Sequence, residues 1–327
     1  MGSREETKPQ TATDFCGQSV ATRDAYGATL AELGAANDKI VVLDADLSGS
    51  TKTAKFAKLF PGRFFNMGIS EQDMIGTAAG FSLTGKIPFA STFAVFETGR
   101  AWEQIRQTIC YSHLNVKLCA SHSGLTVGED GASHQALEDI ALMRVLPEMT
   151  VVVPSDGYET VQVIQTAAAF EGPVYVRLGR AKVTACMPQD YRFEIGKGYS
   201  FGIGKDANII AVGIMLPMAL KAREMLAGEG IDAGVINMAS IKPLDTILVL
   251  EAARASQFIV TCEEHSVLGG LGGAVSEYLS EHHPALVKKI GVQDTFGCSG
   301  PASELLKLFG LTPEAIAECV KTGLKQK

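Results

Sequence analysis

One acidic residue, Glu71, opens the segment EQDMIGTAAGF (71–81), which is rich in glycine and alanine. A carboxyl group beside such small residues can do general acid–base chemistry, because a ligand or a second chain can approach the backbone there. It can also serve only the fold. Ser70 followed three residues later by Asp73 matches a helix capping box, and the helix dipole stabilises an acid in a first turn. This stretch alone favours the structural interpretation.

The loop SHSGLTVGEDGASHQALED (121–139) carries His122, Glu129, Asp130 and His134 among several glycines. A loop of this composition has little packing purpose, so two imidazoles and two acids favour a catalytic or substrate-binding role. Solvated loop histidines are the plain alternative. A metal site is a rival, but the spacing of the two histidines fits no helical ligand pair such as HExxH. We therefore expect no metal ligands in this chain.

Further polar and aromatic side chains follow the apolar runs of the first half of the sequence. They are Asp44, Asp46, Ser48 and Ser50 after IVVL, Ser70 and Glu71 after FFNM, Phe93 and Phe96 after PFAST, His122 after VKLCAS, and Arg180 after VYVRL. Open parallel sheets bind ligands beyond the carboxyl ends of their strands, so this shared position predicts one site. Two phenylalanines at helical spacing are usually core, although rings at a helix start can also stack on a flat heterocycle.

The composition limits the classes of function. The chain has 327 residues, 46% of them apolar and 20% charged, which suits two globular domains of ordinary size. A net charge of −7 without a basic run disfavours nucleic acid or an anionic membrane as partner. Seven cysteines without a CxxC pair are typical of reduced thiols. No stretch has the pattern of a signal peptide or a membrane span, so we expect a cytoplasmic protein.

The elements that must position these residues are short β-branched runs in alternation with helical patterns. The runs lie at 40–43, 116–120, 150–154, 174–178, 208–214, 233–238, 258–262 and 287–292. Such alternation predicts an α/β protein with mainly parallel sheets covered on both faces. The pattern breaks in a glycine-containing stretch, which predicts a boundary. We expect a flexible tail (1–20), a first domain (21–187), a linker (188–205) and a second domain (206–327).

The segment EEHSVLGGLGGAVSEYL (263–279) imitates a dinucleotide-binding turn, because it follows an apolar run and opens a helical pattern. Its match to GxGxxG is imperfect and comes late in the chain. A turn that packs a helix closely on a strand is the favoured interpretation.

Several of these segments together resemble one known family. GISEQDM, STFAVFETGRAWEQ, the loop with its GEDGxxHQ pattern, and VYVRLGR are similar to the pyrimidine-binding domain of thiamine-diphosphate enzymes of the transketolase group. The resemblance runs in order from about Arg23 to Lys327, and the second half is similar to the C-terminal domain of that family. It implies two doubly wound domains.

The resemblance implies a role for each matching position. Glu71 matches the glutamate that hydrogen-bonds the aminopyrimidine of thiamine diphosphate and promotes its imino tautomer, with burial between chains keeping the acid protonated. Around the cofactor, Phe93 and Phe96 match the aromatic pocket that surrounds the pyrimidine, and Asp46 matches an acid near the cofactor. Toward the substrate, His134 matches a group at the reacting carbonyl, and Asp130 matches a residue that hydrogen-bonds a substrate hydroxyl. Ser50, His122 and Arg180 match the positions that hold a sugar phosphate. The sequence departs at Gly99, where many members have a tyrosine.

The resemblance also points to a missing half. Family members bind the diphosphate and its Mg²⁺ through Gly-Asp-Gly followed by Asn in an N-terminal domain, and this sequence contains no such tripeptide. Its nearest look-alike, at 155–157, has no suitable asparagine downstream. We therefore expect the C-terminal subunit of a split transketolase, which transfers a two-carbon ketol unit between sugar phosphates. An N-terminal subunit would hold Mg²⁺ and the diphosphate, in a heterotetramer.

Three alternatives stay open. A 1-deoxyxylulose-5-phosphate synthase would use the same residues but decarboxylate pyruvate. The β subunit of a 2-oxo acid dehydrogenase E1 has the right size, although its loop histidine is expected in a different pattern. A non-catalytic binding or regulatory module is opposed by the intact Glu71, Asp130 and His134. The sugars also stay open, because a sulfonated or branched sugar could satisfy the same Ser, His and Arg cluster.

Overall fold

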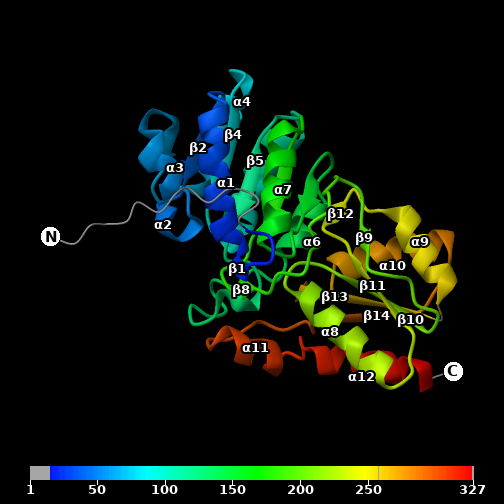
Figure 1. Ribbon diagram of the computed structural model, residues 1–327. Helices are drawn as coiled ribbons and strands as arrows, with labels where there is room; N and C mark the ends of the chain where they lie inside the picture. The colour runs from blue at the N-terminus through cyan, green and yellow to red at the C-terminus, as the bar shows by residue number, and fades with distance from the viewer. Residues whose placement is uncertain (1–14, 257, 326–327) are drawn as a thin grey trace.

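Two mainly parallel sheets organise the computed structural model, which describes residues 15–256 and 258–325. The larger sheet has seven strands in the order β12-β6-β7-β5-β4-β2-β3, and the smaller has five in the order β14-β13-β10-β11-β9. The colours of Figure 1 show that the larger sheet comes mostly from the first half of the chain and the smaller from the second. The predicted α/β class is confirmed.

The strands correspond closely to the apolar runs of the sequence. Those of the larger sheet are β2 (Ile40–Asp44), β3 (Phe64–Asn66), β4 (Ile87–Ser91), β5 (Lys117–Ala120), β6 (Thr150–Val152), β7 (Val174–Arg177) and β12 (Ser240–Lys242). Those of the smaller sheet are β9 (Tyr199–Ser200), β10 (Ala207–Ala211), β11 (Ala233–Asn237), β13 (Ile259–Ser266) and β14 (Val287–Val292). A separate antiparallel pair joins β1 (Val20–Ala21) to β8 (Lys182–Val183).

One edge strand of the larger sheet, β12, comes from the second half of the chain. It runs antiparallel to β6, with Ser240 beside Val152. All other neighbours in that sheet are parallel. The sequence pattern did not indicate this strand, because it is only three residues long and lies far from its sheet in sequence.

Helices cover both faces of each sheet. Those of the first half are α1 (Thr22–Ala36), α2 (Ser48–Thr51), α3 (Ala54–Leu59), α4 (Glu71–Leu83), α5 (Trp102–Gln104), α6 (Asp139–Arg144) and α7 (Gly157–Ala169). Those of the second half are α8 (Met215–Gly228), α9 (Thr246–Ala255), α10 (Leu271–His282), α11 (Ala302–Leu308) and α12 (Pro313–Lys325). Two π-helical segments, Phe96–Arg100 and Ile105–Cys110, flank α5. Within the described residues, no helix is long and apolar enough to cross a membrane.

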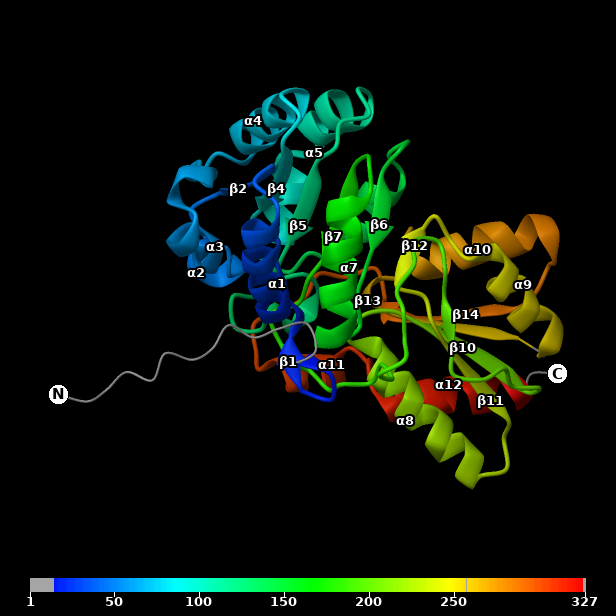
Figure 2. The same cartoon turned by 45° about the horizontal axis from the view of Figure 1, so that its top comes forward.

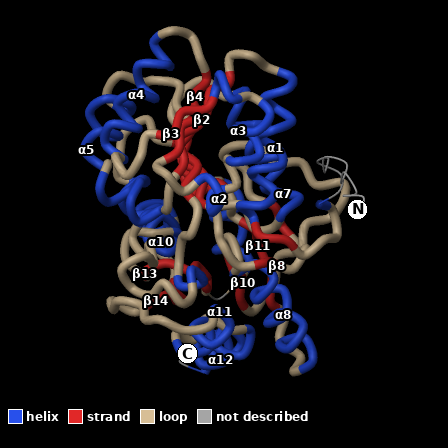
Figure 3. The backbone as a smooth tube through the Cα atoms, turned by 90° about the vertical axis from the view of Figure 1, so that its left-hand side faces the viewer, coloured by secondary structure: helices blue, strands red, loops and turns tan. Residues whose placement is uncertain are grey.

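Alternation along the buried strands explains the layers. In β2, Val42 joins the cluster that includes residues of α1 and α7, whereas Val41 and Leu43 join the cluster of α4 and α6. Successive strand residues point to opposite faces, so a strand buried on both sides is apolar along most of its length. Figure 2 shows α1 and α7 along one face of the larger sheet, and Figure 3 shows its strands between α4 and α5 on one side and α1 and α3 on the other.

The predicted flexible tail lies outside the described residues as far as residue 14. Beyond it, Phe15 is 1% exposed and packs with Ala25, Ala28 and Val161. Val20 pairs with Val183 in the small antiparallel sheet. These last residues before α1 are therefore part of the folded structure rather than of a tail.

Candidate active site

The predicted site residues gather where the parallel strands of the larger sheet end. Asp46 and Ser50 follow β2, Glu71 comes after β3, Phe93 follows β4, and His122 follows β5. Arg180 comes directly after β7. The parallel register of these strands puts their carboxyl ends on one edge. The topology therefore brings together side chains that are far apart in sequence.

Glu71 is the first residue of α4, and its side chain is only 2% exposed. The Arg100 guanidinium lies against it, with Nη1 at 2.8 Å from each carboxylate oxygen. The capping box expected from Ser70 and Asp73 is wrong, because the Ser70 side chain makes no capping hydrogen bond. In the chain by itself, an ion pair with Arg100 holds the acid in place.

Aromatic rings form a wall next to this ion pair. The rings of Phe93 and Phe96 are nearly parallel, with centroids 6.0 Å apart, and the Arg100 guanidinium carbon lies 4.8 Å from the centre of Phe96. His134 stands edge-on to Phe96, with centroids 5.4 Å apart. A Cβ at Gly99 would meet no atom within 4 Å. The wall is therefore open at the position where the family pattern often has a tyrosine.

His122 connects the aromatic wall to a cationic cluster. Its ring stacks on Phe93 at 3.8 Å between centroids, and its Nε2 lies 3.0 Å from Nη1 of Arg23. Arginine can only donate, so Nε2 accepts, and the proton on Nδ1 is donated to Ser121 Oγ, 2.9 Å away. Burial, and then the charges of Arg23 and Arg180, lower the pKa of His122 to about 3. The imidazole is therefore neutral at pH 7.

Arginines dominate the charge around His122. Arg23 also donates from Nη1 to the Ser50 carbonyl at 3.0 Å. Arg180 donates to the Val127 carbonyl and lies 3.8 Å from the Asp130 carboxylate. The charges of Arg23, Arg180 and Lys52 all oppose protonation of the imidazole. Such a cluster suits a phosphate or sulfonate group.

The two aspartates after β2 have different surroundings. Asp44 is fully buried and accepts from the Leu47 N–H and from the hydroxyls of Thr51 and Thr53, so it builds the turn. Asp46 is exposed, has a positive φ of 63°, and accepts from Asn66 at 2.9 Å. Asp46 is therefore accessible to a ligand, but it is not part of the aromatic wall.

Sequence reasoning missed three charged residues of this region. Arg23 and Arg100 were given no role, although each contacts a predicted site residue. Glu97 is fully buried, and neither of its carboxyl oxygens has a hydrogen-bond partner within the described residues. Burial, followed by the nearby charges of Asp44 and Glu71, raises the pKa of Glu97 well above its usual value. The sequence did contain a signal for two of these residues: Glu97 and Arg100 are the charged residues of FETGR, which begins less than one helical turn after Phe93.

A buried ion pair lies at the end of the loop 121–139, which carries His122 and His134. Arg177 in β7 donates from Nε and Nη2 to the two oxygens of Asp139 at 2.7 and 3.0 Å, and the Tyr175 hydroxyl donates to the same carboxylate. Burial alone would raise the pKa of Asp139, but the Arg177 guanidinium outweighs it and lowers the pKa. The pair therefore stays charged at neutral pH.

Replacing one member of this pair should be costly. Arg177→Met leaves the Asp139 carboxylate buried without its cation, so we expect the free energy of unfolding to fall by about 3–5 kcal/mol. Urea titration followed by circular dichroism measures the loss. The exposed pair of Lys321 and Glu229, 3.1 Å apart, provides the control, because Lys321→Met should cost no more than about 1 kcal/mol. Equal effects of the two variants would contradict the prediction.

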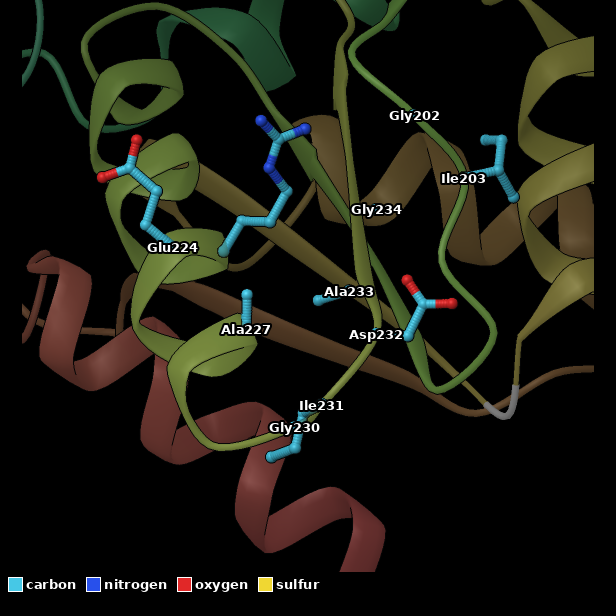
Figure 4. A pocket seen from close by; sticks show the side chains of 10 residues that line it. Gly202, Ile203, Glu224, Ala227, Gly230, Ile231, Asp232, Ala233 and Gly234 are labelled. Carbon is cyan, nitrogen blue, oxygen red and sulfur yellow. The ribbon is translucent and has the colours of Figure 1, made fainter.

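Two other candidate places have different explanations. The N–H groups of Leu271 and Gly272, at the start of α10, donate to the Glu263 carboxylate at 2.7 and 2.8 Å. The backbone N–H groups of the turn that imitates a dinucleotide site are thus already hydrogen-bonded to the Glu263 side chain. A hollow of about 570 Å³, lined by Arg223, Glu224 and Asp232 among others, lies at the amino end of β11 (Figure 4). Ligand sites of parallel sheets lie at the opposite ends.

Comparison with known families agrees with this geometry. The model of the transketolase pyrimidine-binding domain matches residues 18–185, and that of the transketolase C-terminal domain matches residues 200–316. The chain belongs to the transketolase family. It is 51% identical over 310 residues to the "Putative transketolase C-terminal section" of Methanocaldococcus jannaschii, covering 93% of this chain and 96% of that protein.

Other similar proteins place this chain within the transketolase family. A solved structure described as "Split gene transketolase, inactive beta4 tetramer" is 55% identical, with a TM-score of 0.86, covering 94% of this chain and 99% of that one. The transketolase of Rattus norvegicus is 40% identical, and the match covers 95% of this chain but only 50% of the rat protein. This chain therefore corresponds to the C-terminal part of a transketolase.

Proposed function

We propose that this chain is the C-terminal subunit of a two-chain transketolase that moves a two-carbon ketol unit from a ketose phosphate to an aldose phosphate. The observation that carries the proposal is the meeting of Glu71, Phe93, Phe96 and His134 at one sheet edge, beside a cluster of arginines. An acid, a flat apolar wall, an imidazole and an anion site are the parts that such a reaction needs.

The residues fit the pyrimidine ring of thiamine diphosphate. Glu71 is a buried acid paired with Arg100, whose guanidinium lies against the Phe96 ring, and the open position at Gly99 leaves room nearby. Glu71 would hold the proton at a ring nitrogen, and Phe93 and Phe96 would contact the ring. Asp46 would lie near the cofactor, which supplies the carbanion and electron sink for breaking and making carbon–carbon bonds.

Other residues of the chain would handle the sugar. His134, edge-on to Phe96, would hold or move a proton at the substrate carbonyl oxygen. Asp130 is exposed on the same loop and would accept a hydrogen bond from a substrate hydroxyl. The anionic end of the sugar would bind to Ser50, His122 and Arg180, and the structure adds Arg23 to this set.

A partner subunit would complete the site. Among residues 15–256 and 258–325, no group of three or more His, Cys, Asp or Glu side chains is arranged to hold a metal ion. We assign Mg²⁺ and the diphosphate to an N-terminal subunit, within a heterotetramer. The 50% coverage of rat transketolase and the inactive tetramer of the split-gene relative support this division.

The direct test mixes the purified chain with a candidate N-terminal subunit, thiamine diphosphate and Mg²⁺, then measures ketol transfer across a panel of sugar phosphates. We expect activity only in the mixture. Activity of this chain alone would refute the two-chain proposal. Pyruvate decarboxylation would instead indicate a 1-deoxyxylulose-5-phosphate synthase, and transfer to a lipoyl domain would indicate a 2-oxo acid dehydrogenase.

Unusual sugars form the second candidate substrate class. Relatives that are each 38% identical include a 6-deoxy-6-sulfo-D-fructose transketolase subunit of Clostridium sp. and an apulose-4-phosphate transketolase subunit of Phocaeicola vulgatus. The cluster of Arg23, Arg180 and His122 suits a sulfonate as well as a phosphate, so both classes belong in the substrate panel.

A further inference from the structure

The loop that carries Asp130 and His134 is tied to the second half of the chain as well as to its own sheet. The backbone N–H of Thr126 donates to Oε1 of Glu264 in β13 at 2.6 Å. Gln135 is 4% exposed, and its Nε2 donates to the carbonyls of Leu125 at 3.1 Å and Cys298 at 2.9 Å. Two buried side chains thus join the loop to β13 and to the segment before α11.

Glycines allow the two surfaces to come this close. A Cβ at Gly124 would lie 2.3 Å from the Glu264 carboxyl carbon, and one at Gly297 would lie 1.9 Å from Oε1 of Gln135. A Cβ at Gly131 would lie 2.3 Å from the Ser299 hydroxyl. A side chain at these positions would displace the Glu264 carboxyl, the Gln135 amide or the Ser299 hydroxyl, so the contact depends on shape as well as on hydrogen bonding.

Two further contacts, made by Arg177 and by α11, also join the loop to the second half of the chain. Arg177 donates from Nη2 to the backbone carbonyls of Glu264 at 3.0 Å and Ala136 at 3.2 Å, so one buried guanidinium spans both halves. Helix α11 packs against the 3₁₀ turn Leu125–Val127 within the loop. Figures 1 and 2 both show α11 beneath the first half of the chain.

We infer that Gln135 and Glu264 are positioning residues, through which the C-terminal half holds the catalytic loop in register with Phe96. The inference rests on the proposed function for what the loop does, but the contacts themselves do not. Gln135 directly follows His134, so the two hydrogen bonds of its amide fix the backbone next to the imidazole. Without these donors, the carbonyls of Leu125 and Cys298 lose their side-chain partner, and the loop loosens.

Hydrogen exchange on the full-length chain tests the contact without any activity. The variant Gln135→Met keeps the size of the side chain but donates no hydrogen bond. We expect the amides of residues 125–135 to exchange at least about tenfold faster, with the amides of α7 unchanged. The control is Gln162→Met, because Gln162 donates to Tyr191 and accepts from Phe193, away from the loop. Unchanged exchange at 125–135 in Gln135→Met would overturn the inference.

Kinetics of the assembled enzyme test what the contact does. Gln135→Met should lower kcat about tenfold and raise KM for the ketose donor, with the affinity for thiamine diphosphate unchanged. Glu264→Leu should behave in the same way, whereas Glu264→Gln, which keeps an acceptor for the Thr126 N–H, should recover most of the loss. A lower Tm with unchanged kcat and KM would overturn the positioning role. If the wild-type mixture transfers no ketol unit, the proposed function fails, while the exchange experiment still decides whether the contact exists.

Discussion

Glu71→Ala in the assembled enzyme should lower kcat by about 10³-fold, within the range that general acid–base groups contribute. The carboxyl group is nearly enclosed, at 2% exposure, so bulk water cannot easily replace it. Assays of ketol transfer at saturating cofactor measure the effect. Glu71→Gln should retain more activity than Glu71→Ala, because the amide keeps a hydrogen-bonding group in the same place.

Unfolding should not explain that loss. Removal of the Glu71 carboxylate leaves Arg100 without its anion, but the Arg100 side chain is 50% exposed and can be hydrated. The matched control is Asp73→Asn, because Asp73 lies in the same helical turn but is exposed. Its kcat should stay within about twofold of wild type, since the exposed Asp73 carboxylate is expected to interact only with the helix dipole. A Glu71→Ala enzyme as active as wild type would remove the basis of the proposed function.

Arg23→Met and Arg180→Met should each lower kcat/KM for a phosphorylated ketose by about 10²-fold. A hydrogen bond to a charged group contributes about 1.5–3 kcal/mol, and every 1.4 kcal/mol corresponds to a factor of ten. The corresponding sugar without phosphate should be used equally well by wild type and variants. The comparison of the two sugars therefore separates anion recognition from general damage to the site.

An exposed arginine supplies the control for this series. Arg106 is exposed and donates to its neighbour Gln107, so Arg106→Met should leave kcat/KM for both sugars unchanged. Arg23→Met has a second expected effect, because Arg23 helps to lower the pKa of His122. That pKa should rise in the variant, as measured by NMR titration of the imidazole. An equal loss for phosphorylated and unphosphorylated sugars would contradict an anion site at Arg23.

Most strands of the first half could be predicted from the sequence, because they are buried on both faces. A doubly buried strand such as β2, with every residue from Ile40 to Asp44 enclosed, appears as the apolar run IVVL before a single acid. The short strands β9 and β12 gave no such signal. Each has only two or three residues, and each is held by pairing with a strand distant in sequence.

The candidate site was predictable where position along a strand decides it. His122 and Arg180 were placed at the sheet edge by their distance from an apolar run. The ion pair between Glu71 and Arg100 was not, because it depends on the wider turns of the π-helical segment Phe96–Arg100. The capping box failed for a similar reason: spacing suggests which groups can meet, but the Ser70 side chain makes no capping hydrogen bond in the folded chain.

The strand β12 has a consequence for any attempt to produce the first domain alone. A cut in the linker would remove β12, the antiparallel neighbour of β6, and leave the backbone groups of β6 that face β12 without a strand partner. Exposed strand edges of this kind template intermolecular pairing, so the shortened protein should form insoluble aggregates. We therefore expect that a cut in the linker at 188–205 does not yield a soluble first domain.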